Sequence, residues 1–108
     1  MGYGDHHFEE TALQMKSLIE PRAVAIVGAS SKIEKVGGAI TRNALEGEYK
    51  GKIYLVNPNA TQIFGRKVYP SLQEIPEDID LAEIVVSAPL VPMIMEQAVK
   101  KEVKVALI

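Results

Sequence analysis

The sequence predicts an α/β fold, a doubly wound parallel sheet in a single domain. Short apolar runs rich in β-branched residues alternate with segments of helical spacing, which is the order of a parallel sheet crossed by helices. The first run, residues 23–27, has no polar alternation, as expected for a strand covered on both faces. With 108 residues the chain is long enough for one such domain.

The first half of the chain contains a complete strand-helix-strand unit. A short amphipathic helix is expected over residues 9–19 and ends before Pro21, which disfavours helical backbone in the residue that precedes it. After the first strand, a helix is expected over 37–45, and Gly47 supplies its stop. A second strand at 52–56 completes a βαβ unit, for which the right-handed connection is expected.

The segment after the second strand has two interpretations. Residues 63–69 form either a small hairpin or a loop that leads to a short edge strand, and the loop with an edge strand is favoured. Ser71 and Glu74 then have the spacing of a capping box, which predicts a brief helix. Pro76 ends this helix.

The last third of the chain repeats the strand-helix-strand order. A buried strand is expected over 81–87, a helix over 91–101 with Pro92 in its first turn, and a final strand over 103–108. The apolar side of that helix is predicted to contain Ile94, Met95, Ala98 and Val99. The final strand leaves an apolar edge with unpaired backbone groups, so a homo-oligomer formed through this edge is an open alternative.

Composition excludes several classes of function. The net charge of −2, with both signs interspersed, predicts no nucleic acid partner. No apolar run approaches the roughly 20 residues that span a bilayer, so no membrane partner is expected. The chain has no cysteine, which makes the cytoplasm the default location. His6 and His7 fall within residues 1–8, interpreted as a disordered or artificial N-terminal segment, and no metal site is predicted.

The stretch most indicative of function is the turn after the first strand. The strand breaks at Gly28 and passes through Ser30, Ser31, Lys32 and Lys35 before the next helix begins. Glycine permits close backbone approach, and the N–H groups at a helix start have no partners within the helix. Lysine adds a flexible positive charge. The turn therefore predicts a site for a phosphorylated ligand.

Two further loops are expected beside this turn. Ligands of doubly wound sheets bind at the carboxyl ends of the strands, near the switch in strand order. In this chain those ends are residues 28–31, 57–59 and 87–89, which are small, polar or stiffened by proline. They leave room for a ligand to lie across them.

Neither of two common nucleotide motifs fits these loops. A dinucleotide fingerprint requires a second glycine two residues after Gly28 and a carboxylate at the end of the second strand. Ser30 and Asn57 occupy those regions instead. A Walker phosphate loop ends in Gly-Lys-Ser or Gly-Lys-Thr, and the sequence has neither.

Several segments in order resemble the CoA-binding domain of NDP-forming acyl-CoA synthetases, a group that includes ADP-forming acetate–CoA ligase and is related to the succinyl-CoA synthetase α subunit. The resemblance extends from about Leu13 to Ile108. It is carried by residues 21–30, 35–40, 51–58, 69–72, 80–82 and 88–89. It implies a Rossmann-like domain with CoA as the ligand.

The resemblance also implies a role for each loop. The phosphates would be held by Gly28, Ala29, Ser30, Ser31 and Lys32, with Val36 and Gly37 at the far side. Asn57 and Pro58 would line the adenosine side. The pantetheine arm would run beside Ser87, Ala88 and Pro89.

The catalytic part of the family does not carry over to this chain. In the family, acyl-CoA, ADP and phosphate yield the acid, CoA and ATP through a histidine on a following domain and a nucleotide-binding grasp domain. The resemblance implies that residues 9–108 are the CoA-binding domain, shortened at its C-terminus, with no catalytic residue. The implied partners are CoA or acyl-CoA and other domains or subunits of an acyl-CoA synthetase.

Two alternatives remain at this point. One is a stand-alone CoA-binding module without catalysis. The other is an NAD(P)-binding regulatory domain, in which Arg66 or Lys67 would meet a 2′-phosphate.

Overall fold

The computed structural model describes residues 21–32 and 35–108. The predicted helix at 9–19, the two histidines and the proposed terminal segment 1–8 lie outside the described residues. The strands and helices are β1 (Ala23–Val27), α2 (Val36–Glu46), β2 (Lys52–Val56), β3 (Gln62–Ile63), β4 (Arg66–Tyr69), the 3₁₀ turn η1 (Leu72–Glu74), β5 (Leu81–Ile84), the 3₁₀ turn η2 (Ala88–Leu90), α3 (Val91–Lys101) and β6 (Val105–Leu107).

The strands form one sheet in the order β3-β4-β2-β1-β5-β6. Strand β1 lies in the centre and pairs in parallel with both β2 and β5, while β4 and β6 extend the parallel sheet on either side. After β1 the chain builds outward on one side through β2, and it later returns to the other side of β1 at β5. This arrangement confirms the Rossmann-like doubly wound fold, and its switch point lies between β1 and β5.

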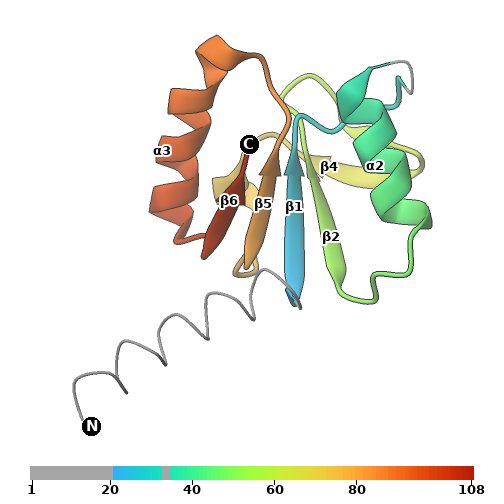
Figure 1. Ribbon diagram of the computed structural model, residues 1–108, viewed down its shortest axis with the longest axis horizontal. Helices are drawn as coiled ribbons and strands as arrows, with labels where there is room; N and C mark the ends of the chain where they lie inside the picture. The colour runs from blue at the N-terminus through green and yellow to red at the C-terminus, as the bar shows by residue number, and fades with distance from the viewer. Residues whose placement is uncertain (1–20, 33–34) are drawn as a thin grey trace, which may run out of the picture.

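The two faces of the sheet have separate cores. On one face, Ile26 and Leu55 pack with Ile40 and Ala44 of α2. On the other face, Ala25, Val27 and Val56 belong to a cluster that includes side chains of η1 and α3. All five residues of β1 are buried, which explains why the strand has no polar position. The carboxyl ends of β1, β2 and β5 point to one edge of the sheet, at the top of Figure 1, where α2 also begins.

Two local predictions in the middle of the chain were wrong. Strands β3 and β4 form an antiparallel hairpin rather than a loop leading to an edge strand. The turn uses Phe64 at φ 50° and Gly65 at φ 74°, and left-handed backbone at two successive positions is typical of a tight hairpin turn. The capping box is also absent: Ser71 makes no side-chain cap, and its carbonyl accepts a hydrogen bond from the Glu74 N–H at 3.2 Å.

Two predictions about the last third needed correction as well. Strand β5 ends at Ile84 rather than at residue 87, because its neighbour β1 ends at Val27, whose carbonyl accepts from the Val85 N–H and is the last β1 group that pairs with this segment. On α3, Val99 is 72% exposed and does not join the apolar side. At 100° per residue it lies about 140° around the helix from the buried Ile94.

Asp80 joins three strands at the opposite, amino edge of the sheet. Its carboxylate accepts hydrogen bonds from the N–H groups of Arg22 at 2.7 Å and Ala23 at 3.3 Å, and it forms an ion pair with Lys104 at 3.1 Å. Its own N–H donates to the Ala23 carbonyl, and its carbonyl accepts from the Val105 N–H. Burial alone would raise the pKa of Asp80, but these bonds outweigh it and lower that pKa below its ordinary value.

No helix within residues 21–32 and 35–108 is long and apolar enough to cross a membrane. Over the same residues, no three side chains of the metal-binding types (His, Cys, Asp, Glu) come together as a candidate metal site.

Candidate functional site

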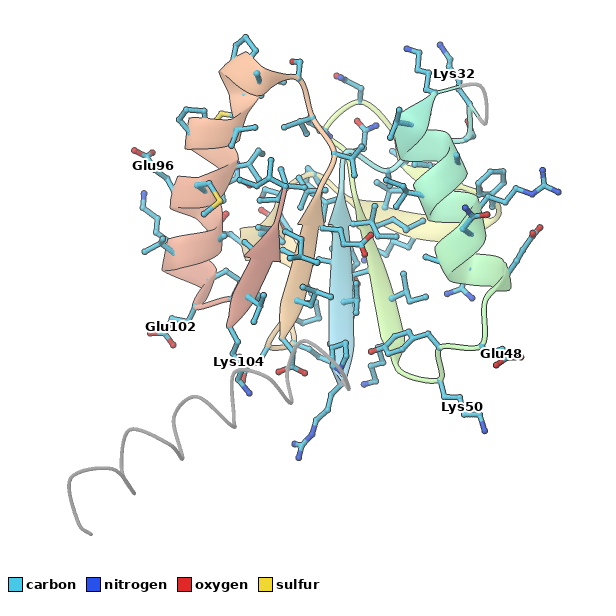
Figure 2. All side chains as sticks on the ribbon, viewed as in Figure 1. Lys32, Glu48, Lys50, Glu96, Glu102 and Lys104 are labelled. Carbon is cyan, nitrogen blue, oxygen red and sulfur yellow. The ribbon has the colours of Figure 1, made fainter. Side chains whose placement is uncertain are left out.

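An open pocket of about 470 Å³ lies at the switch point of the sheet. It is bounded by the turn after β1, the first turn of α2 and the loop after β5. Its lining residues are Gly28, Ser30, Lys35, Val36, Gly37, Val85, Val86 and Ser87. Figure 2 shows Lys32 at this edge of the molecule, whereas Lys50 and Lys104 lie at the other edge.

Three stretches of backbone meet so closely at this pocket that two positions require glycine. Gly28 has φ +95°, and a Cβ placed on it would lie 2.1 Å from the carbonyl oxygen of Val85. A Cβ on Gly37 would lie 2.5 Å from the carbonyl oxygen of Gly28. Both distances are below any real van der Waals contact, so the β1 turn, the β5 loop and the start of α2 approach one another through bare backbone.

The N–H groups of the glycine turn are used within the fold. Gly28 and Ala29 both donate to the carbonyl of Val56, at 2.9 and 3.3 Å. The Ser30 N–H donates to the hydroxyl of Thr41 at 3.3 Å. The turn therefore shapes the pocket, and these three N–H groups are directed at other parts of the protein rather than at a ligand.

The start of α2 offers a different set of donors. Lys35 precedes the helix in extended conformation and makes no side-chain cap. The first N–H groups of any helix have no acceptor within the helix, and they carry the positive end of its dipole. Lys35 lines the pocket, and Lys32 lies exposed on the loop that leads to it. None of the described residues that line the pocket is acidic, so its electrostatics suit an anion.

Asn57 connects the ends of β1 and β2. Its side-chain Nδ2 donates to the carbonyl of Ala29 at 2.8 Å, and its Oδ1 accepts from the Asn59 N–H at 2.8 Å. The Asn57 N–H donates to the carbonyl of Tyr69 at 3.0 Å. The side chain of Asn57 thus holds the loops of two neighbouring strands in register, and Pro58 beside it is exposed.

The structure brings together some of the residues predicted from the sequence and separates others. Those that line the pocket are Gly28, Ser30, Lys35, Val36, Gly37 and Ser87. Ala29 is fully buried and belongs to the core on the α2 face of the sheet. The predicted residues outside the lining are Ser31 and Lys32 on the exposed loop, Asn57 and Pro58 at the end of β2, and Ala88 and Pro89 in η2.

Sequence reasoning missed three residues of the site. Val85 and Val86 line the pocket, although both had been assigned to the interior of a strand. Thr41 is fully buried on α2 and binds the turn through its hydroxyl. The available signal for Thr41 was its position four residues after Gly37, on the helix face that carries the paired glycines.

The chain resembles much longer proteins of known type. It is 41% identical over 101 residues to ADP-forming acetate–CoA ligase II of Archaeoglobus fulgidus, covering 94% of this chain and 15% of that protein. It is 45% identical over 97 residues to the α subunit of ADP-forming acetate–CoA ligase I of Pyrococcus furiosus, covering 86% of this chain and 21% of that subunit. The chain therefore spans about a fifth or less of these relatives.

Solved structures agree with the sequence relatives. A dinucleotide-forming acetyl-coenzyme A synthetase 1 of Ca. Korarchaeum cryptofilum, in complex with phosphate and ADP, superposes with a TM-score of 0.81 at 38% identity, over 85% of this chain and 20% of that one. A hypothetical protein of Pyrococcus horikoshii OT3 superposes with a TM-score of 0.74 at 32% identity, over 90% of this chain and 66% of that one. Since residues 22–108 also match the family model described as a CoA binding domain, this chain belongs to the CoA-binding domain family.

Proposed function

We propose that this chain binds the nucleotide end of CoA or acyl-CoA in the pocket at the switch point, as the CoA-binding part of an ADP-forming acyl-CoA synthetase. The observation that carries the proposal is the pocket itself. It lies where doubly wound sheets bind their ligands, it is floored by glycine backbone, and it has a lysine and no acidic side chain among its described lining residues.

Each part of the ligand has a proposed place. The phosphates lie against the start of α2 at Val36 and Gly37, with Ser30, Ser31 and the side chains of Lys32 and Lys35 around them. This placement is supported by the helix-start donors and the local excess of positive charge.

The remaining two loops serve the rest of the molecule. The adenosine lies beside Asn57 and Pro58, where the side chain of Asn57 is held by Ala29 and so acts mainly through shape. The pantetheine arm passes Ser87, Ala88 and Pro89. Ser87 supports this route, because it lines the pocket and begins the loop toward α3.

The end of β2 favours CoA over NAD. An NAD site places a carboxylate there to bind both ribose hydroxyls, and this chain has Asn57, whose amide is already bonded to Ala29 and Asn59. CoA carries a pyrophosphate and a further 3′-phosphate. A pocket with lysines at its edge complements that charge.

The reaction of the whole enzyme is part of the same proposal. Relatives are named as ADP-forming ligases that act on acetate and on 4-hydroxybutyrate. We infer that this chain delivers CoA as a substrate to chemistry performed elsewhere, because it spans only 15% and 21% of the two acetate–CoA ligase chains compared above. The acid that becomes attached to CoA would be selected by those other parts.

Other domains or subunits of the synthetase are the proposed partners. A second hollow of about 460 Å³ lies beside α2 over β5 and β6, and it is lined in part by Ile40, Ala44, Glu83, Leu107 and Ile108. Leu107 is 42% and Ile108 78% exposed there. We assign this mainly apolar hollow to contact with another part of the synthetase, because the matched relatives include a separate α subunit.

Isothermal titration calorimetry on the whole chain tests the CoA proposal. CoA should bind more tightly than NAD. Lys35→Ala should weaken CoA binding roughly 5- to 30-fold, the loss of one charge-assisted phosphate contact of about 1–2 kcal/mol. Lys50→Ala is the matched control, since Lys50 is exposed at the other edge of the molecule, and it should leave CoA affinity unchanged. Absence of CoA binding by folded protein, or tighter binding of NAD, would overturn the proposal.

Sedimentation velocity tests the partner surface. The chain should sediment as a monomer alone, and a synthetase polypeptide carrying the remaining domains should bind it in a manner weakened by Leu107→Asp. A concentration-dependent dimer that Leu107→Asp abolishes would instead assign the hollow to a second copy of this chain.

A further inference from the structure

Thr41 lies at the junction between the glycine turn and helix α2. Its side chain is fully buried. The hydroxyl donates to the carbonyl of Gly37 at 2.7 Å and accepts from the Ser30 N–H at 3.3 Å. One hydroxyl therefore joins the first turn of the helix to the turn that follows β1.

This junction extends outward to the loop with the exposed lysine. The side-chain oxygen of Ser30 accepts a hydrogen bond from the Lys32 N–H at 3.0 Å. Three hydrogen bonds in series thus lead from Gly37, through Thr41 and Ser30, to the backbone of Lys32. The orientation of an exposed loop is set by a group in the interior of the protein.

The contacts of Thr41 also show that it has no direct role toward a ligand. A hydroxyl has one proton to donate, and here Gly37 accepts it. Thr41 does not line the pocket and is separated from it by Gly37 and Ser30, which do. Any effect of Thr41 on binding must act through the positions of those two residues.

We infer that Thr41 is a positioning residue for the phosphates of the ligand, an inference that rests on the proposed CoA function. A valine at this position would have nearly the shape of threonine but could not accept the Ser30 N–H. The turn would then be free to move away from the start of α2. The N–H groups at the helix start and the loop that carries Lys32 would no longer be held in a fixed arrangement relative to each other. Binding of the phosphates should suffer, while binding of the pantetheine arm should not.

Calorimetry with three ligands on Thr41→Val and Thr41→Ser tests this inference. Thr41→Val should bind CoA and ADP about tenfold more weakly than the natural chain and should bind pantetheine with unchanged affinity. Thr41→Ser keeps the hydroxyl and should restore CoA binding to within about threefold. Circular dichroism at the temperature of titration establishes that each variant is folded. If Thr41→Val does not fold, Thr41→Cys replaces it, because sulfur is a weaker partner of similar size.

The outcomes distinguish this inference from the proposed function. If the natural chain does not bind CoA, the proposed function fails. If the natural chain binds CoA and folded Thr41→Val binds it equally well, the role of Thr41 is refuted. The role is also refuted if Thr41→Val loses affinity for pantetheine and CoA alike, or if Thr41→Ser shows the same loss as valine, since both results indicate a general packing defect.

Discussion

Replacing Gly28 by alanine should lower the free energy of unfolding more than most other glycine-to-alanine substitutions in this fold, and Gly65 provides a matched control. Both glycines have positive φ, +95° and +74°, so both variants carry the cost of left-handed backbone, about 1–2 kcal/mol. They differ in their surroundings. A Cβ on Gly65 has no atom within 4 Å, whereas one on Gly28 lies 2.1 Å from the carbonyl oxygen of Val85.

The additional loss at Gly28 can be worked out from its contacts. Relief of the clash requires the β1 turn and the β5 loop to separate by about an ångström, since ordinary contacts exceed about 3 Å. Two hydrogen bonds hold them in place, from Val85 N–H to Val27 at 2.8 Å and from Gly28 N–H to Val56 at 2.9 Å. At about 1 kcal/mol each, their loss brings the total for Gly28→Ala to about 3–4 kcal/mol.

Urea unfolding followed by circular dichroism measures both variants. Gly65→Ala should lower the free energy of unfolding by about 1–2 kcal/mol, and Gly28→Ala by at least about 2 kcal/mol more. In thermal melts this additional loss should place the midpoint of Gly28→Ala roughly 8–16 °C below that of Gly65→Ala for a domain of this size. Equal losses in the two variants would refute the argument that Gly28 is required for close backbone approach rather than for its φ angle alone.

Three further predictions follow from other contacts. Because the pKa of Asp80 is lowered on folding, its contribution to stability is present above its ordinary value of 3.8 and is lost as pH falls through the folded value. Urea midpoints of the natural chain and Asp80→Asn should differ at pH 6, and the difference should shrink as the pH falls below 3.8; a difference that stays constant would contradict this. Burial, together with a hydrogen bond to Glu77 and the negative charge of Glu77, raises the pKa of Tyr54 to about 12. Glu77→Gln should lower the pKa of Tyr54 only in part, since burial is the larger cause, and absorbance titration at about 295 nm measures this change. Finally, Val99→Glu should change the free energy of unfolding by less than about 0.5 kcal/mol, whereas Ala98→Glu, at a position only 4% exposed, should cost several kcal/mol, and similar urea midpoints for the two would refute the assigned helix face.

The fold was predictable because the local sequence of most strands and helices agrees with the structure that they form. The apolar run of β1 matches its five buried positions, and Gly47 follows the last residue of α2. The errors arose where tertiary context decides the outcome. The length of β5 depends on where β1 ends, and nothing within residues 81–87 reports that. The αL conformation of Phe64, rare for an aromatic residue, was likewise invisible in a pattern of apolar positions.

The glycine positions of the candidate site were predictable from the sequence, whereas the side-chain contacts that hold its loops in place were not. Gly28 and Gly37 stand out because glycine after a buried strand and at a helix start has few other uses. Asn57 was predicted to belong to the site because it follows the second strand. The hydrogen bond from its side chain to the Ala29 carbonyl joins residues 28 positions apart in sequence, so the sequence pattern could not predict it. Thr41 is an ordinary helix residue until the turn above it is in place. Only part of the pocket lining thus leaves a signal in the sequence: the glycines do, whereas Val85 and Val86 resemble ordinary strand residues.

The Asp80 junction has a consequence for how such a domain can diversify. A single carboxylate connects the beginnings of β1, β5 and β6, and all of its partners lie at the amino edge. The loops at the carboxyl edge take no part in this junction, and their own fixed points are the close approaches at Gly28 and Gly37 and the side-chain hydrogen bonds of Thr41 and Asn57. Other positions in these loops, such as the exposed Ser31, Lys32 and Pro58, can change in chemistry while the strands stay anchored at the amino edge. New ligand-binding side chains can therefore be introduced there, provided that Asp80 and those four residues are left unchanged.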